Sequence, residues 1–263
     1  MARVNELDCG CVYTAARYGM RSLTPAILVA GLCFGQATPR FEVVSIKPNR
    51  SDDRGGNMKP IAGGFSARNL SVSMLIQSAY NVKPWEIAGG PGWLTTDGYD
   101  IEAKAEGNPT FQEKLAMLRP LLADRFQLKF HRETRQMPIY SLTVAKNGPK
   151  LQATAAGVQG FIRPGRGLIE GNSVTMGTLA GFLGGSLGQS VTDNTGVIGG
   201  FDIRLEWTPT EMEANYQYDD RPIDSTGPSI FTAIQEQLGL KLEAGKGPIE
   251  VLVIDHVERP LEN

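Results

Sequence analysis

The residue best placed to act as a nucleophile is a serine in a glycine-rich run. Gly184-Gly185-Ser186-Leu187-Gly188 matches the pattern G-x-S-x-G, in which a serine attacks a carbonyl when a sharp turn from strand into helix presents it and a base lies within reach. Here the run follows Leu183 at the end of a helical stretch. We therefore interpret it as a glycine-rich helix terminus and assign no catalytic residue.

The candidate bases for Ser186 are the two histidines, His131 and His256. His131 lies among charged residues, so we expect it to be exposed. The order Asp-His-Val-Glu around His256 would place that ring and Glu258 on one face of a strand, and we interpret this face as solvated. With two histidines, a zinc site would need carboxylates for most of its ligands. We expect neither a metal nor a cofactor.

Two aspartates and two tryptophans are the candidate ligand-binding residues. Asp100 and Asp202 each follow an aromatic residue at the start of a strand pattern. A duplication could bring them together as paired carboxylates, but we favour a turn or capping role for each. Trp93 follows Gly-Gly-Pro-Gly and is the best candidate for an exposed aromatic that recognises a ligand. We expect a ligand in a groove between two halves of the chain, near Trp93, Asp100, Asp202 and Trp207.

These candidates lie in two stretches that resemble each other. Ser71-Val72-Ser73-Met74 recurs as Ser173-Val174-Thr175-Met176, and an Asp follows the Met at the same distance in both stretches. Three further runs recur in the same order: 64–69 at 167–172, 126–130 at 238–242, and 138–139 at 248–249. Matches in one order predict an internal duplication.

Each copy is expected to run strand, helix, strand, helix and then a two-strand ribbon. The first copy should contain a strand at 64–69, a helix at 72–80, a strand at 99–105, a helix from about 110 to 124, and strands at 128–130 and 139–144 joined by a turn at 133–136. Thr110 and Glu113 form a capping box for the second helix. Pro120 should kink or split that helix.

The second copy should repeat this order. Its expected elements are a helix at 174–187, a strand at 201–207, a helix at 229–238, and strands at 240–243 and 249–257. Ser229 is the expected N-cap and Gly239 the expected helix stop. Residues 209–227 form an expected surface loop, and a strand at 41–47 should join the first sheet. The pattern predicts an α+β fold with mixed or antiparallel sheets.

Composition excludes several classes of protein. The 263 residues are 41% hydrophobic and 21% charged, which is typical of a globular protein. The formal charge of −2 excludes a broad electrostatic nucleic-acid binder, because phosphate affinity needs excess Lys and Arg. Glycine is abundant, at 31 residues, but its pairs lack the Lys-Ser/Thr of a phosphate loop and are better explained as turns.

The N-terminal segment resembles an export signal. All three cysteines lie in it: Cys9, Cys11 and Cys33. It also holds the only long apolar stretch, 23–37, which has Arg21 before it and small residues near its end. That stretch is too short to span a bilayer, which takes about 20 apolar residues. We expect a leader at 1–37, with translation starting at Met20, that is either cleaved or kept as an anchor. The mature chain would then be periplasmic or extracellular, without a transmembrane span.

Specific runs along the chain also resemble a known family. They are Gly89-Gly90-Pro91-Gly92-Trp93, 121–126, 131–135, 193–196, 206–209 and 235–242. These runs are similar to those of the soil-associated group of uncharacterised exported proteins, numerous in acidobacterial-type genomes. The resemblance covers about residues 40–263. It implies kinship with domains appended to membrane metallopeptidases of the beta-lactam-sensor type, and it implies no catalytic residue.

We therefore expect an exported module in two related halves, 38–150 and 151–263, that binds or senses without catalysis. Its partner would be a small ligand or an envelope protein, and it would bind no nucleic acid. One alternative is an envelope hydrolase that uses Ser186 or the pair of Asp100 and Asp202. Another is a free-standing cousin of the metallopeptidase-attached domain, which docks on a membrane partner.

Overall fold

The computed structural model describes residues 39–51, 56–209 and 227–261. The chain divides into two compact units, Met1–Ala37 and Thr38–Asn263, and all described residues belong to the second. The expected leader with its three cysteines lies outside the described residues, as does nearly all of the expected loop at 209–227.

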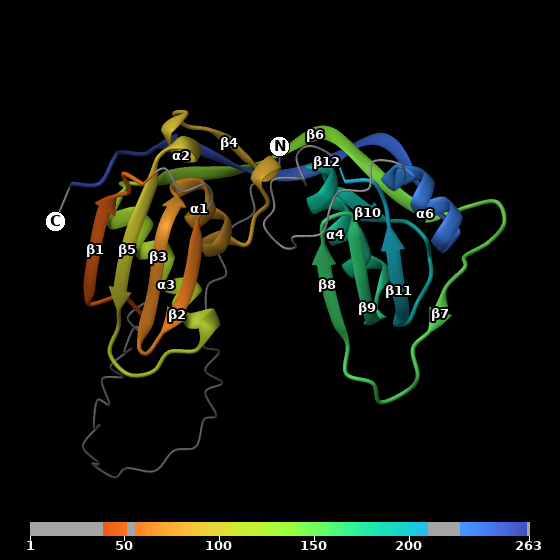
Figure 1. Cartoon of the computed structure of the whole chain (residues 1–263). Helices are drawn as coiled ribbons and strands as arrows, with labels where there is room; N and C mark the ends of the chain where they lie inside the picture. The colour runs from red at the N-terminus through yellow and green to blue at the C-terminus, as the bar shows by residue number, and fades with distance from the viewer. Residues whose placement is uncertain (1–38, 52–55, 210–226, 262–263) are drawn as a thin grey trace, which may run out of the picture. The chain divides into compact units, whose positions relative to one another are not determined.

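The first half contains an antiparallel four-stranded sheet with the strand order β1-β5-β3-β2 (Figure 1). Its strands are β1 (Val43–Pro48), β2 (Asn57–Ile61), β3 (Gly64–Ser71) and β5 (Gly98–Lys104). Two helices, α1 (Val72–Tyr80) and α3 (Phe111–Arg125), contribute buried residues to the same core. The expected strands and the first helix are confirmed, including the first strand's place in this sheet.

Local capping sets the helix boundaries in this half. The Ser71 hydroxyl accepts a hydrogen bond from the Met74 N–H at the start of α1. At the start of α3, Thr110 and Glu113 form the expected capping box. The hydrogen bonds from the backbone N–H and the hydroxyl of Thr110 lower the pKa of the Glu113 carboxyl. Pro120 does not split α3, because buried leucines on both sides of it hold one helix in the core.

The second half contains another four-stranded sheet with the order β7-β11-β9-β8. Its strands are β7 (Gln152–Ala153), β8 (Phe161–Gly165), β9 (Leu168–Val174) and β11 (Phe201–Glu206), and its helices are α4 (Met176–Leu187) and α6 (Ile230–Leu238). Ser229 caps α6 and Gly239 ends it in the left-handed conformation, as expected. α4 begins later than expected, because the Thr175 side chain accepts a hydrogen bond from the Thr178 N–H.

The two sheets share their strand register. In the first, Ala67 pairs with Ile101 and Leu70 with Tyr99; in the second, Gly171 pairs with Ile203 and Val174 with Phe201. Both sheets have an irregularity between these pairs, at which Asn69 and Ser173 adopt positive φ angles. The N-caps Ser71 and Thr175 therefore correspond, whereas the sequence match had paired Ser71 with Ser173. Common descent of the halves stays a prediction.

A third sheet corrects the expected topology. β6 (Lys129–Val144) and β12 (Leu240–His256) are two continuous strands, paired antiparallel from Val144 opposite Leu240 to Lys129 opposite His256. Figure 1 shows them as one long ribbon. The expected turn at 133–136 and the separate ribbon in each half are therefore wrong. The polar residues at 133–136 lie in the strand, and most are exposed to solvent.

Short parallel strands border this ribbon. β4 (Ile87–Gly89) pairs with β12, and β10 (Val191–Asp193) pairs with β6, which gives the order β10-β6-β12-β4. The structure therefore has antiparallel and mixed sheets with helices, and the predicted α+β class is confirmed. No helix among the described residues is both long and apolar enough to cross a bilayer.

The ribbon contributes to both hydrophobic cores of the second unit. Leu252 and Ile254 of β12 belong to the cluster of the first half, together with residues of α1 and α3. Leu142 of β6 and Leu240 of β12 belong to the cluster of the second half, together with residues of α4 and α6. Two strands far apart in the sequence thus complete both cores.

Candidate functional site

A cavity of about 240 Å³ beside α4 is the candidate site. Segments from several parts of the chain line it: Lys83, Pro164, Gly165, Arg166, Leu168, Ile169, Gly181, Phe182, Gly185, Ser186 and Trp207. Two of these side chains are cationic, and none is a carboxylate or a histidine.

Buried apolar side chains contribute to the lining. Leu168 and Ile169 come from the start of β9, and Trp207 follows the end of β11. All three are at least nine-tenths buried. The Trp207 backbone N–H donates to the Gly167 carbonyl oxygen at 2.9 Å. Because residues alternate between the two faces of a strand, Trp207 continues the buried row of Ile203 and Leu205.

A row of glycines on α4 leaves space beside the cavity. Gly177, Gly181 and Gly185 recur at successive helical turns, and a Cβ placed at any of them would meet no atom of the described neighbouring residues within 4 Å. Each interior helical glycine costs about 1 kcal/mol of stability relative to alanine. Packing against the described part of the chain does not require these glycines, and two of them, Gly181 and Gly185, line the cavity. Their effect is to keep this surface of α4 open.

The two cations come from different halves of the chain. Arg166 lies between β8 and β9, and Lys83 is the residue before the short 3-10 helix η1 (Pro84–Glu86). Lys83 is exposed and makes no ion pair with a described residue. η1 also approaches α4, because a Cβ at Gly184 would lie 3.7 Å from the Trp85 ring.

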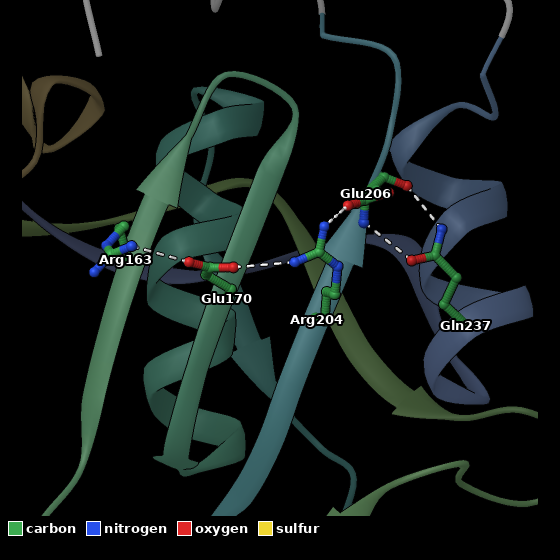
Figure 2. Close-up of polar contacts among 5 residues, drawn as sticks. All are labelled: Arg163, Glu170, Arg204, Glu206 and Gln237. Carbon is green, nitrogen blue, oxygen red and sulfur yellow. Dashed lines mark hydrogen bonds and ion pairs between the residues drawn. The ribbon is translucent and has the colours of Figure 1, made fainter. Parts of the chain in front are cut away.

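The charges on the outer side chains of this sheet compensate one another. Figure 2 shows Glu170 of β9 between Arg163 of β8 and Arg204 of β11, at 3.1 Å from each. Arg204 also pairs with Glu206, whose backbone N–H and carbonyl both hydrogen bond to the Gln237 amide of α6. Acids and bases are interleaved in this cluster, whereas the two charged side chains among the described lining residues are both basic.

Ser186 lies in the last turn of α4, which ends at Gly188 in the left-handed conformation. The interpretation of this run as a helix terminus is confirmed. Both histidines are instead in the ribbon strands and bind carboxylates: His131 Nδ1 lies 2.8 Å from Asp255, and His256 Nε2 lies 3.0 Å from Glu258. The described part of the chain contains no group of three or more His, Cys, Asp or Glu residues that could hold a metal ion.

The two repeated aspartates lie in different sheets, each bonded within its own half. The Asp100 carboxylate accepts hydrogen bonds from the Asn69 backbone N–H at 2.9 Å and from the Asn49 amide at 2.8 Å. Asp202 accepts a bond of 2.6 Å from the Thr154 hydroxyl, which itself accepts one from the Ser173 N–H. Both aspartates lie inside strands and bond to the residue with positive φ at the sheet irregularity, Asp100 directly and Asp202 through Thr154. This contact between strands differs from the turn or capping role that we favoured.

Asp100 gives a testable pH dependence. Burial acts to raise its pKa, but the hydrogen bonds from Asn69 and Asn49 and the charge of Arg68 together outweigh burial, so the pKa lies below its ordinary value. The stabilisation is therefore complete above the unfolded-state pKa and is lost as pH falls through the folded-state pKa. We expect the unfolding free energy to fall less steeply below about pH 4 in Asp100→Asn than in the wild type. Urea titrations at a series of pH values measure this, and parallel curves would contradict it.

Trp93 is half-buried rather than exposed. Its ring packs against the core of the first half, and the Arg259 guanidinium lies 5.1 Å from the ring centroid. That arginine is also bound to the Asp97 carboxylate at 2.9 Å. Of the four residues predicted from the sequence to contact a ligand, Trp207 lines the cavity. Trp93, Asp100 and Asp202 do not.

Among the lining residues that sequence reasoning missed are two cations and an aromatic residue: Lys83, Arg166 and Phe182. They come from segments that no motif connects. The signal that could have indicated the site is the four-residue spacing of Gly177, Gly181 and Gly185, since exposed helix positions rarely repeat glycine without a reason in packing or function.

Comparisons with known proteins place the chain in a family without giving it an activity. Residues 73–257 match the family described as "Protein of unknown function (DUF3738)". No curated protein and no solved structure matches the chain. Since the matched residues make up more than half of the sequence, the chain belongs to the DUF3738 family.

Proposed function

We propose that this DUF3738 chain is a non-catalytic binding module of the cell envelope, which holds a small ligand in the cavity beside α4. The observation that carries the proposal is the cavity itself, with the buried Trp207 in its lining and unpacked glycines on its helix. Ligand sites are typically concave and mostly apolar, with few polar groups, and this lining has that composition.

The cavity volume sets the size of the ligand. An apolar cavity of about 150 Å³ is known to hold a benzene molecule. A cavity of about 240 Å³ therefore has room for one aromatic ring with a small polar substituent. Such a ring would gain contact with the indole of Trp207 and the phenyl group of Phe182, because offset or edge-to-face aromatic pairs contribute about 0.5–1.5 kcal/mol beyond burial.

The envelope location rests on the sequence. The apolar stretch at 23–37 with Arg21 before it supports export, as does the resemblance to soil-associated exported proteins and to metallopeptidase-attached domains. We expect mass spectrometry of the native protein to find an N-terminus near Thr38 in an envelope or secreted fraction. Intact Met1 in the cytosol would contradict export and would leave the binding proposal standing.

A hydrolase is the second candidate, because Ser186 lines the cavity. None of the described lining residues is a histidine or a carboxylate that could activate its hydroxyl, and this favours binding. A panel of small esters distinguishes the two functions. Turnover that is lost in Ser186→Ala would support hydrolysis, whereas ligand binding that Ser186→Ala retains without turnover would support the binding module.

Ligand-detected NMR with a set of single-ring aromatic fragments tests the binding proposal. We expect fragments to bind the wild type and to lose binding in Gly181→Leu, whose side chain would enter the cavity. Gly177→Leu is the matched control: it changes the same exposed row of α4 but is not part of the lining. Leucine favours helix over glycine, so neither variant should lose stability. Absence of binding to the wild type, or equal binding by both variants, would overturn the proposal.

A further inference from the structure

We propose that Asn147 is a site of spontaneous covalent modification, at which the backbone nitrogen of Gly148 displaces the side-chain amide and the residue becomes aspartate or isoaspartate. Asn147 and Gly148 form the only Asn-Gly pair in the sequence. Asparagine is among the thermolabile residues, and a glycine in the next position has no side chain to shield its nitrogen. Neither residue lines the cavity beside α4, so the inference is independent of the proposed function.

The pair lies in a tight turn between β6 and β7. The Gly148 N–H donates to the Ala145 carbonyl oxygen at 2.9 Å, so residues 145–148 form a β-turn. Neither central residue of this turn has a positive φ angle, which is typical of a type I turn with glycine at its last position. Asn147 is exposed, and its side-chain amide makes no hydrogen bond with another described residue. The amide is therefore free to turn toward the backbone.

The reaction needs only water and hydroxide. The Gly148 nitrogen gives its proton to hydroxide and attacks the side-chain carbonyl carbon of Asn147. The bond from this carbon to the amide nitrogen breaks, and the nitrogen takes a proton from water and leaves as ammonia, so that a cyclic succinimide remains. Water then opens the ring at its side-chain carbonyl, which gives aspartate, or at its backbone carbonyl, which gives isoaspartate. Because the attacking N–H is bonded to Ala145, the turn must open before the reaction begins.

The turn also caps the C-terminal end of α6, so a change in it has a structural effect. Carbonyl oxygens at the end of a helix have no partner within the helix. Here the Glu236 carbonyl accepts a hydrogen bond of 2.8 Å from the Lys150 side chain, and the Leu238 carbonyl accepts one of 2.8 Å from the Lys150 N–H. The Gly239 carbonyl accepts one of 3.0 Å from the Ala145 N–H. Residues on both sides of the modified one thus hold the end of α6.

Both products should disturb this cap. Each adds a carboxylate close to the negative end of the α6 dipole, where an anion is unfavourable. The packing is also close, since a Cβ at Gly239 would lie 2.2 Å from the Gly148 carbonyl oxygen. Isoaspartate adds a methylene group to the backbone and would displace that carbonyl. We expect the last turn of α6 to loosen, whereas Ile234, which is fully buried, should hold the rest of the helix in the core.

Incubation of the full chain at mildly alkaline pH tests the assignment, with peptide mass spectrometry and enzymatic isoaspartate labelling as readouts. We expect Asn147 to be converted before any other asparagine and to carry the label. Asn147→Gln should lose the label, because a glutamine side chain would have to close a larger ring. Asn108→Gln is the matched control and should keep it: Asn108 is also exposed, but it precedes Pro109, which has no N–H.

Three outcomes would contradict the inference. Earlier conversion of another asparagine, or a label of equal strength in Asn147→Gln, would overturn the assignment. So would an unmodified full chain under conditions that convert a short peptide of residues 143–151. Amide hydrogen exchange tests the structural effect. We expect faster exchange at the last turn of α6 in the modified protein, and unchanged exchange there would overturn the role of the turn as its cap.

Discussion

Gly64→Ala is expected to lower the free energy of unfolding by about 3 kcal/mol or more. The added methyl group would overpack a position whose neighbours cannot move aside, and this costs more than a typical surface substitution. A Cβ at Gly64 would lie 1.9 Å from the carbonyl oxygen of Ala103 in the neighbouring strand. Both positions belong to the central pair of the first sheet, β3 and β5. The clash is with backbone, so no side-chain rotation relieves it. Urea denaturation followed by circular dichroism measures the loss.

Gly92→Ala is the matched control for this variant. Gly92 has right-handed helical dihedral angles, with φ of −59°, and a Cβ there would meet no atom within 4 Å. We expect its unfolding free energy to stay within about 0.5 kcal/mol of the wild type, as at other unconstrained surface positions. Equal stability of Gly64→Ala and Gly92→Ala would contradict the close pairing of β3 with β5.

Leu142→Ala is expected to cost about 2–5 kcal/mol, the usual range for removing a fully buried leucine side chain. Leu142 lies in β6 at 0% exposure and belongs to the core of the second half. It is paired with Leu242 of β12, and β12 continues into the core of the first half through Leu252. Amide hydrogen exchange should therefore show lower protection along the ribbon, including the end near Leu252, and in the second core.

Thr134→Ala is the control for the ribbon. Thr134 lies in the same strand but is exposed, so the change should stay within about 0.5 kcal/mol of the wild type. If Leu142→Ala lowered protection in the second core and left the far end of the ribbon unchanged, the two ends would unfold independently. That result would contradict the ribbon as a structural link between the cores.

Local interactions explain which predictions from the sequence succeeded. The start of α3 depends on Thr110 and Glu113, and the end of α6 depends on Gly239. Each signal lies within a few residues of the boundary that it sets, because capping bonds join neighbours in the chain. The helix terminus at Ser186 was predicted correctly for the same reason.

The errors arose where distant segments decide the structure. The polar residues at 133–136 were interpreted as a turn, but their strand pairs with residues more than 100 positions away in β12. Exposure in the middle of a long ribbon and exposure in a turn produce the same polar pattern. Similarly, nothing near Trp93 in the sequence indicates that Arg259 stacks on its ring.

The sequence by itself determined the α+β class and most of the strands and helices, because periodicity and caps are local properties of the chain. Only the tertiary structure decided that the two ribbon strands pair with each other and complete both cores. It also decided the candidate site, since Lys83, Arg166 and Trp207 come together around one cavity from separate segments. Their proximity depends on how the sheets and α4 pack, and the spacing of these residues in the sequence does not indicate that packing.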